Sequence, residues 1–426
     1  MQVRKHWIVV SLLCLGGAIS YLDRAALSIA APLIAKDLKL DPSHLGIVLS
    51  SFFIGYAPLC FVGGYLSDRI GPKRVLIGAM LFWSLFCGLT ATATSLVALV
   101  TIRIFFGMGE GPFVANINKL VSNWFERKQQ ATAIAISNAG MPLGAALAGP
   151  VVGFLAVREG WHFAFISIAI LGVLWVLLWA AFAADRPSRS GEQSEENSRR
   201  SGTVESPIAQ KSLAYYLLKP STITTAYAFF GYAYVQFFFL TWFPSYLTTA
   251  HGLSIKSMAV ATVFPWVGNI VGLIIGGLVS DLLFRLTGRA IFSRKLILTT
   301  CLAAGAICIA LMATVKDATS AVVLMSLGAF FMAATYNTYF AIVLDTVEKA
   351  RVGAIGGFVH FVSNLAGIVA PLLTGYLVQW SGDFRSAFML TGLIAASGAL
   401  LVLVFVRAPR VQRGVVDSTQ SSNALP

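Results

Sequence analysis

Long apolar runs separated by short polar connections recur along the whole chain. Each run has about 20 residues or more, the length that an α-helix needs to cross the hydrocarbon core of a bilayer. They lie at about 8–33, 44–66, 75–93, 97–118, 131–156 and 163–184, and again at 222–247, 258–284, 296–314, 319–344, 353–378 and 386–407. The pattern predicts an all-α membrane protein with twelve transmembrane helices in two units of six.

A polar interval separates the two groups of six runs. Residues 185–220 are rich in Ser, Glu and Arg, a composition that cannot bury enough apolar surface to fold by itself. We therefore predict an amino-terminal six-helix bundle at 1–184, a cytoplasmic linker at 185–220, a carboxyl-terminal six-helix bundle at 221–410 and a cytoplasmic tail at 411–426.

The basic residues indicate the orientation of the spans. The termini, the linker and the connections after even-numbered spans carry most of the 31 Lys and Arg residues. Basic residues next to spans stay in the cytoplasm, so both termini are predicted to be cytoplasmic. The charged share of 12%, against about a quarter in soluble proteins, argues against a soluble enzyme. The net charge of +13 then reflects topology, and no nucleic-acid partner is expected.

The connections after spans two and eight carry related motifs. The first reads Gly-x-x-x-Asp-Arg-x-Gly-x-Lys-Arg, and the second is a shorter copy of it. Small residues allow helices to approach closely, and the charges can lock a cytoplasmic gate. The predicted gating residues are Gly64, Asp68, Arg69, Gly71, Arg74 and Asp281. Repeated six-span units place a binding site near the membrane midplane between the halves.

These motifs carry a family resemblance. The loop after span two is similar to the signature loop of the major facilitator superfamily. Within it, segments 21–32 (YLDRAALSIAAP), 103–111 (RIFFGMGEG) and 240–247 (LTWFPSYL) resemble the anion:cation symporter family, which includes bacterial sugar-acid transporters. The resemblance runs from the first span to the last. It implies the major facilitator fold and proton-coupled symport of a small organic anion by alternating access, in a bacterial inner membrane.

Four charged residues lie well inside the spans, all in the amino-terminal half: Asp23, Arg24, Arg103 and Glu110. A charge at the bilayer centre costs about 2.5 kcal/mol or more, so such residues usually line a cavity and pair. Arg103 and Glu110 are seven residues apart and share a helix face. The neighbours Asp23 and Arg24 point about 100° apart, so one can face the cavity and the other a partner helix. Two fixed ion bridges between spans one and four are the structural alternative.

The four charges sum to zero, and a substrate carboxylate and a proton entering together restore that sum. Glu110 is the first candidate for the proton-linked acid and Asp23 the second, as the resemblance also implies. Arg24 is the candidate clamp for the substrate carboxylate, because a guanidinium offers two parallel donors. Arg103 shares that role or restrains Glu110.

Neutral residues complete the predicted substrate site. Tyr56 matches a tyrosine that contacts substrate in sugar-acid members of the family, with a core aromatic as the alternative, and Tyr21 belongs to the matching first segment. In the carboxyl-terminal half, Asn364 is chosen from several polar residues suited to hydroxyl groups. Met141 stands where sugar-acid members tend to place an amide, which favours a smaller or more apolar carboxylate. Asn138 can partly replace that amide.

Other functional classes fit the sequence less well. A drug or metabolite:proton antiporter is suggested by Ala-x-x-x-Gly-Pro at 145–150, but a cationic drug favours an unpaired acid, and this site holds two arginines. No nucleophile, base and oxyanion hole are assembled, and the Cys and His residues lack metal-ligand spacing. We expect no enzyme activity and no cofactor. The expected partners are a small organic anion, a proton and the lipid bilayer, around a monomer.

Overall fold

The computed structural model describes residues 2–125, 127–184, 212–348 and 351–406. Within these ranges the regular structure is helical, and twelve segments are long and apolar enough to cross a membrane. The prediction of an all-α membrane protein with twelve spans is therefore confirmed. Most of the predicted linker and tail lies outside the described residues, so the domain boundaries remain a prediction.

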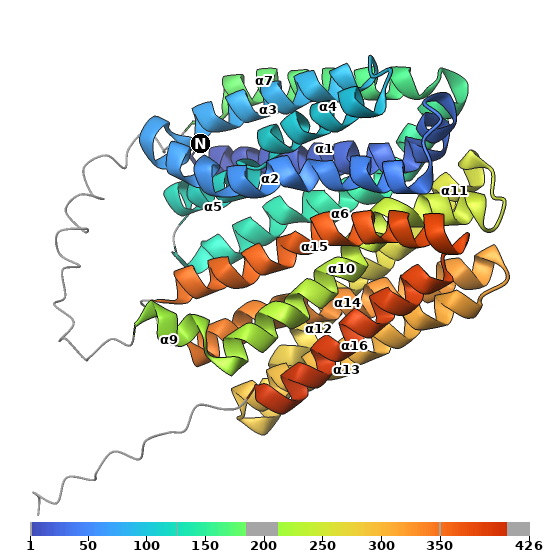
Figure 1. The fold of residues 1–426 in the computed structure, drawn as a ribbon. Helices are drawn as coiled ribbons and strands as arrows, with labels where there is room; N and C mark the ends of the chain where they lie inside the picture. Colours follow the sequence, from blue (N-terminus) through green and yellow to red (C-terminus); the bar gives the residue numbers. More distant parts are fainter. Residues whose placement is uncertain (1, 126, 185–211, 349–350, 407–426) are drawn as a thin grey trace, which may run out of the picture.

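The first six spans come from the amino-terminal half (Figure 1). They are formed by α1 (Gln2–Asp37), α2 (Pro42–Ile70), α3 (Pro72–Thr90), α4 (Leu96–Glu110) with α5 (Phe113–Trp124), α6 (Arg127–Arg158) and α7 (Trp161–Phe182).

The short helix α9 (Leu213–Leu217) precedes the other six spans. These are formed by α10 (Pro220–Thr249), α11 (Ile255–Ala261) with α12 (Val263–Thr287), α13 (Ala290–Leu311) with the 3₁₀ turn η1 (Met312–Thr314), α14 (Ala318–Thr346), α15 (Val352–Ser381) and α16 (Arg385–Phe405).

Polar caps fix where several spans begin. The Asp41 carboxylate accepts a hydrogen bond from the backbone N–H of His44 at 2.8 Å, and Pro42 supplies the first residue of α2. That backbone donor holds the pKa of Asp41 below its usual value. Ser95 caps α4 and Asp317 caps α14 in the same way. Each cap satisfies an N–H group that the first helical turn leaves unpaired.

The apolar run of the fourth span predicts one continuous helix, but the structure divides this span into two helices. α4 ends at Glu110 and α5 begins at Phe113. Pro112 has no backbone N–H to continue the helical ladder, and the N–H of Gly111 makes the last bond of α4, to Gly107 at 3.0 Å. Glu110 therefore lies at a helix end. The end of α4 packs closely on α3, because a Cβ on Gly109 would lie 2.8 Å from Trp83.

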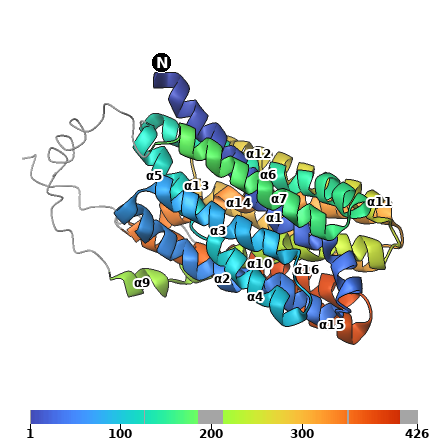
Figure 2. The ribbon, with the colours of Figure 1, turned by 90° about the horizontal axis from the view of Figure 1, so that it is seen from above.

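The two halves pack closely at the end of the bundle away from α9. There α2 meets α15, and a Cβ on Gly46 would lie 2.8 Å from the carbonyl oxygen of Pro371. Near the opposite end of α15, a Cβ on Gly356 or Gly357 would have no neighbour within 4 Å. Figure 2 shows α11, which contacts α6 of the other half, at the end opposite α9. The halves are thus closed at the end remote from α9.

This close contact yields a first prediction. The transport that the family resemblance implies is expected to fall several-fold when Gly46 or Gly375 is replaced with Ala, because each new methyl group would push the halves apart. A Cβ on Gly375 would lie 2.5 Å from the carbonyl oxygen of Pro42. Initial uptake rates, normalised to protein in the membrane, are the measurement. Gly78→Ala is the matched control, because a Cβ there has no neighbour within 4 Å. Equal rates in all three variants would contradict the prediction.

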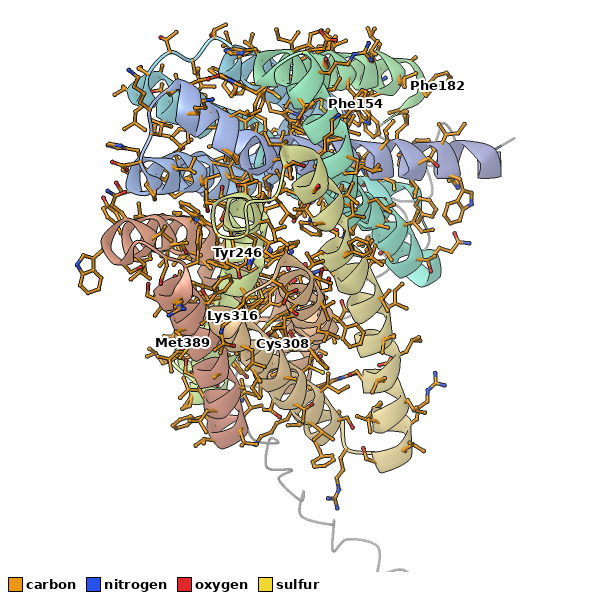
Figure 3. All side chains as sticks on the ribbon, turned by 90° about the vertical axis from the view of Figure 1, so that its right-hand side faces the viewer. Phe154, Phe182, Tyr246, Cys308, Lys316 and Met389 are labelled. Carbon is orange, nitrogen blue, oxygen red and sulfur yellow. The ribbon has the colours of Figure 1, made fainter. Side chains whose placement is uncertain are left out.

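The outer surface of the bundle is apolar. Phe154, Phe182 and Met389 are 56%, 61% and 56% exposed, whereas Tyr246 and Cys308 are buried (Figure 3). Water-exposed apolar surface of this kind would be costly in a soluble protein. It is what a lipid environment requires.

Candidate functional site

A central cavity of about 220 Å³ is lined by residues from both halves. Its polar or titratable lining residues are Ser20, Tyr21, Arg24, Tyr56, Glu110 and Asn138 in the amino-terminal half, and Tyr232, Gln236, Asn269, Tyr336, His360, Ser363 and Asn364 in the other. The charges are therefore all on one wall, and the opposite wall offers neutral donors and acceptors. Five predicted site residues, Tyr21, Arg24, Tyr56, Glu110 and Asn364, meet at this cavity.

Arg24 and Glu110 form a buried ion pair on the cavity wall. The Nη2 atom of Arg24 lies 2.5 Å from Oε1 of Glu110, and the hydroxyl of Ser20 donates to the same oxygen at 2.5 Å. Both charged residues are buried. Within the described part of the chain, Nε of Arg24 and Oε2 of Glu110 have no hydrogen-bond partner. The pair therefore keeps at least one donor and one acceptor unused.

Aromatic rings surround the Arg24 guanidinium. Its Cζ atom lies 4.7 Å from the ring centre of Tyr21, 4.6 Å from that of Phe52 and 4.9 Å from that of Tyr56. Cation–π contacts at these distances attract a guanidinium whether or not a carboxylate is bound to it. The rings can therefore hold Arg24 in place while its anionic partner changes.

Asp23 points away from the cavity. It is buried, and its Oδ1 lies 3.7 Å from the Sγ atom of Cys87 on α3. Arg24 faces the cavity while its neighbour faces a partner helix, the divergence that helical geometry had predicted. Cys87 was absent from the predicted site, because no spacing pattern links a lone cysteine on one span to an acid on another.

Arg103 is also buried outside the cavity lining. Its Cζ atom lies 4.6 Å from the ring centre of Phe106 and 5.3 Å from that of Phe52. Among the described residues it makes no ion pair or hydrogen bond. The Glu110 carboxylate, which shares a helix with Arg103, is bound instead by Arg24 of α1. Arg103 does not line the cavity, and its predicted role in substrate binding remains a prediction.

Two amides bridge helices on the neutral wall. The Nδ2 atom of Asn269 on α12 donates to Oε1 of Gln236 on α10 at 3.1 Å. Asn364 uses its own Nδ2 within α15, where it donates to the backbone oxygen of His360 at 2.9 Å. The Gln236–Asn269 bridge leaves Nε2 of Gln236 as a donor and Oδ1 of Asn269 as an acceptor for a ligand, whereas Nδ2 of Asn364 is engaged by His360. The sequence could not favour them, since their pairing depends on how two helices face each other.

Met141 and Asn138 both line the cavity from α6. The thioether makes this part of the wall less polar. The Oδ1 atom of Asn138 is buried, with no hydrogen-bond partner in the ranges that the structure describes. It remains available to a hydroxyl group of a ligand.

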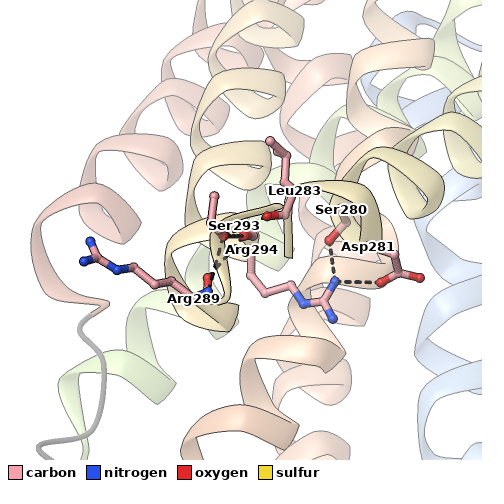
Figure 4. Close-up of polar contacts among 7 residues, drawn as sticks. Ser280, Asp281, Leu283, Arg289, Ser293 and Arg294 are labelled. Carbon is pink, nitrogen blue, oxygen red and sulfur yellow. Dashed lines mark hydrogen bonds and ion pairs between the residues drawn. The ribbon is translucent and has the colours of Figure 1, made fainter. Parts of the chain in front are cut away.

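The second copy of the loop motif forms a polar cluster in the carboxyl-terminal half. Nη1 of Arg294 donates to the hydroxyl of Ser280 at 2.5 Å and to Oδ1 of Asp281 at 3.1 Å (Figure 4). The Asp281 side chain is 66% exposed, and exposed pairs contribute only about 0–1 kcal/mol. The contact links α12 to α13 within one half, so a gating role for Asp281 remains a prediction.

The first copy lies between α2 and α3. Gly71 has a φ angle of 89°, which favours glycine. Arg69 lies over a neighbouring tyrosine ring, and Arg74 is exposed. The side chains at Gly64 and Asp68 lie outside the described residues. The gating roles of these five residues also remain predictions.

Comparisons with known proteins agree with the fold. The sequence profile of the Major Facilitator Superfamily matches residues 13–339 and 286–425. The "Hexuronate transporter" of Bacillus subtilis (strain 168) is 46% identical over 401 residues, which cover 94% of each chain. The "Probable sulfoacetate transporter SauU" of Cupriavidus necator is 32% identical over 406 residues, again 94% of each chain. A crystal structure of a bacterial homolog to the human lysosomal transporter Spinster matches with a TM-score of 0.75 at 15% identity, covering 93% of this chain and 95% of that chain.

Proposed function

The chain belongs to the major facilitator superfamily and is a membrane transporter rather than an enzyme, and we propose that it imports a hexuronate or a related small organic anion together with a proton. The observation that carries this proposal is the Arg24–Glu110 pair on the cavity wall. A substrate carboxylate that binds Arg24 competes directly with Glu110 for the same guanidinium.

The competition couples the anion to the proton. When a substrate carboxylate occupies Arg24, Glu110 loses its cationic partner inside a buried site. An unpaired buried carboxylate is costly, and taking up a proton removes that cost. Anion binding then favours protonation of Glu110, and protonation of Glu110 favours anion binding to the same degree. The charge sum of Asp23, Arg24, Arg103 and Glu110 with one bound monocarboxylate and one proton is again zero.

The cavity supports a hydroxylated carboxylate as substrate. Its charged wall can take the carboxylate at Arg24, while Gln236 and Asn269 face the rest of the molecule from the other half. The hexuronate transporter of Bacillus subtilis, the relative with 46% identity, favours a sugar acid over the more apolar carboxylate that Met141 alone suggests. We therefore infer a hexuronate as the substrate class. We also infer that both termini are cytoplasmic, from the distribution of basic residues, and that the protein is a monomer in a bacterial inner (plasma) membrane, as the family resemblance implies.

Uptake of radiolabelled D-glucuronate into proteoliposomes tests the proposal. An imposed proton gradient, acidic outside, is expected to drive accumulation above the external concentration, and a protonophore is expected to abolish it. Liposomes without protein are the control. Uptake that reaches only the external concentration under the gradient would refute proton coupling. Failure of D-glucuronate and other sugar acids to inhibit one another would refute the substrate class.

A drug:proton antiporter is the remaining alternative. Among the described residues that line the cavity, Glu110 supplies the one carboxylate, and Arg24 already neutralises it. A lipophilic cation therefore has no unpaired acid to bind. Transport of lipophilic cations against a proton gradient, measured in the same proteoliposomes, would favour the antiporter over our proposal.

Hydroxyl recognition can be separated from carboxylate binding. Gln236→Leu is expected to raise the half-saturating D-glucuronate concentration about 3- to 10-fold, because a lost hydrogen bond costs about 0.5–1.5 kcal/mol and 1.4 kcal/mol is tenfold. Inhibition of uptake by hexanoate, which has no hydroxyl groups, should stay within about twofold of the wild-type value. Asn364→Leu is the matched comparison and should change less, since that amide bonds within its own helix. A larger effect of Asn364→Leu than of Gln236→Leu would show that the substrate hydroxyl groups bind at α15.

A further inference from the structure

Cys87 lies where α3 meets both α1 and α7. It is fully buried, at 1% exposure. Its Sγ atom is 3.7 Å from Oδ1 of Asp23 on α1 and 3.8 Å from the backbone oxygen of Phe165 on α7. A thiol carries one proton, so it can donate to only one of these two acceptors at a time. The two distances are nearly equal, so a rotation about the Cβ–Sγ bond is enough to turn the S–H group from one acceptor to the other.

We propose that Cys87 is a positioning residue for Asp23, a rotating donor whose direction follows the charge of that carboxylate. When Asp23 is ionised, the thiol donates to Oδ1, because a charged acceptor binds a donor more strongly than a neutral carbonyl does. When Asp23 is protonated, that advantage is lost and the thiol turns to Phe165. The state of an acid on α1 is thereby transmitted to α7. The inference rests on the proposed function, with Asp23 as the second candidate for a proton-linked acid.

The surroundings of Asp23 favour this role. The charged or titratable groups that face it are Cys87 of α3 and Arg103 and Glu110 of α4. Neither Arg103 nor Glu110 makes an ion pair or hydrogen bond to it in the described part of the chain. The indole N–H of Trp83, one turn earlier on α3, also faces this carboxylate and makes no hydrogen bond to any other group in the described residues. Cys87 differs from Trp83 because its thiol has a second acceptor, the backbone oxygen of Phe165, to which it can turn.

The pH profile of D-glucuronate uptake, measured at a constant proton gradient, tests the inference. Cys87→Ala removes the donor and disfavours ionised Asp23, so protonation should persist to higher pH. The half-maximal pH is expected to rise by about 0.5–1 unit, since one unit corresponds to 1.36 kcal/mol and a thiol is a weak donor. Cys87→Ser keeps a donor and should restore the wild-type midpoint or lie below it. The matched controls Cys308→Ala and Cys308→Ser should leave the midpoint unchanged, because Cys308 is buried on α13 away from charged groups.

The infrared S–H stretch gives a second readout that a purely structural role would not change. The Cys87 band, isolated as wild type minus Cys87→Ser, should move to higher frequency as Asp23 is protonated. In Asp23→Asn the band should be independent of pH. The inference would be overturned if wild type and Cys87→Ala had the same half-maximal pH of uptake, or if the frequency of the Cys87 S–H band in the wild type did not depend on pH. An unchanged uptake profile in Asp23→Asn would instead refute the proton-coupling role of Asp23.

Discussion

Arg24→Gln is expected to lower D-glucuronate uptake more than about 100-fold, and Arg24→Lys about 10- to 100-fold. Removing one partner of a buried charge pair costs about 2–5 kcal/mol, and every 1.4 kcal/mol is a factor of ten. Lysine keeps the charge but loses the planar fork, which costs one charge-assisted hydrogen bond of about 1.5–3 kcal/mol. Lysine also fits the rings of Tyr21, Phe52 and Tyr56 less well, because an ammonium cannot stack as a guanidinium does.

Initial rates at saturating and sub-saturating D-glucuronate are the measurement for the Arg24 variants. The defect should appear mainly in the half-saturating concentration, since Arg24 is proposed to bind the carboxylate. Arg158→Lys is the matched control, because that side chain is 69% exposed and pairs with its neighbour Glu159. Wild-type affinity in Arg24→Lys would show that the substrate carboxylate binds elsewhere.

The twelve spans could be predicted because bilayer crossing imposes a length and a polarity that the sequence shows directly. The helical divergence of Asp23 and Arg24 followed from the same geometry. The pairing of Glu110 did not. The spacing of Arg103 and Glu110 places them on one face of one span, whereas contact with Arg24 depends on how α1 and α4 are rotated against each other. No pattern within a single helix contains that rotation.

The neutral wall of the cavity also contains contacts between helices that the sequence alone could not predict. Asn364 was chosen for its surroundings in the sequence, and it does line the cavity, but its amide bonds its own helix. The bridge between Gln236 and Asn269 joins residues from two helices. The break after Glu110 was better signalled, because Pro112 follows it and a proline cannot continue the ladder. A local signal for the helix end was therefore present in the sequence, although the apolar run at 97–118 predicted a continuous span, while long-range pairing decided which polar groups are free.

A transporter of this kind needs an empty site that is stable and a loaded site that is also stable. In the empty site, the Arg24–Glu110 ion pair compensates both buried charges. In the proposed loaded site, the substrate carboxylate neutralises Arg24 while Glu110 is protonated, so the total charge is the same as in the empty site. A carboxylate without a proton leaves one negative charge uncompensated, which disfavours movement between the two faces. In the proposed mechanism, coupling of the anion to the proton follows from the cost of that uncompensated charge.

Glu110→Gln is therefore expected to retain exchange of D-glucuronate but to lose its proton-driven accumulation. Glutamine resembles the protonated acid in size and charge, and it cannot release a proton. Counterflow between internal and external D-glucuronate should remain within several-fold of the wild-type rate, whereas accumulation under an imposed proton gradient should fall at least about tenfold. Arg24 no longer has a competing carboxylate, so D-glucuronate should bind about tenfold more tightly near neutral pH, as expected for the loss of a charge-assisted bond.

Three measurements on one preparation check the Glu110→Gln variant: counterflow, gradient-driven uptake and the binding affinity at several pH values. In the wild type the affinity should weaken as the pH rises, because ionised Glu110 competes for Arg24. In the variant this part of the pH dependence should disappear. Glu159→Gln is the matched control, since that carboxylate is 49% exposed and lies outside the cavity lining. Full accumulation by Glu110→Gln, with counterflow intact, would show that the coupled proton binds at another residue, with Asp23 the next to be tested.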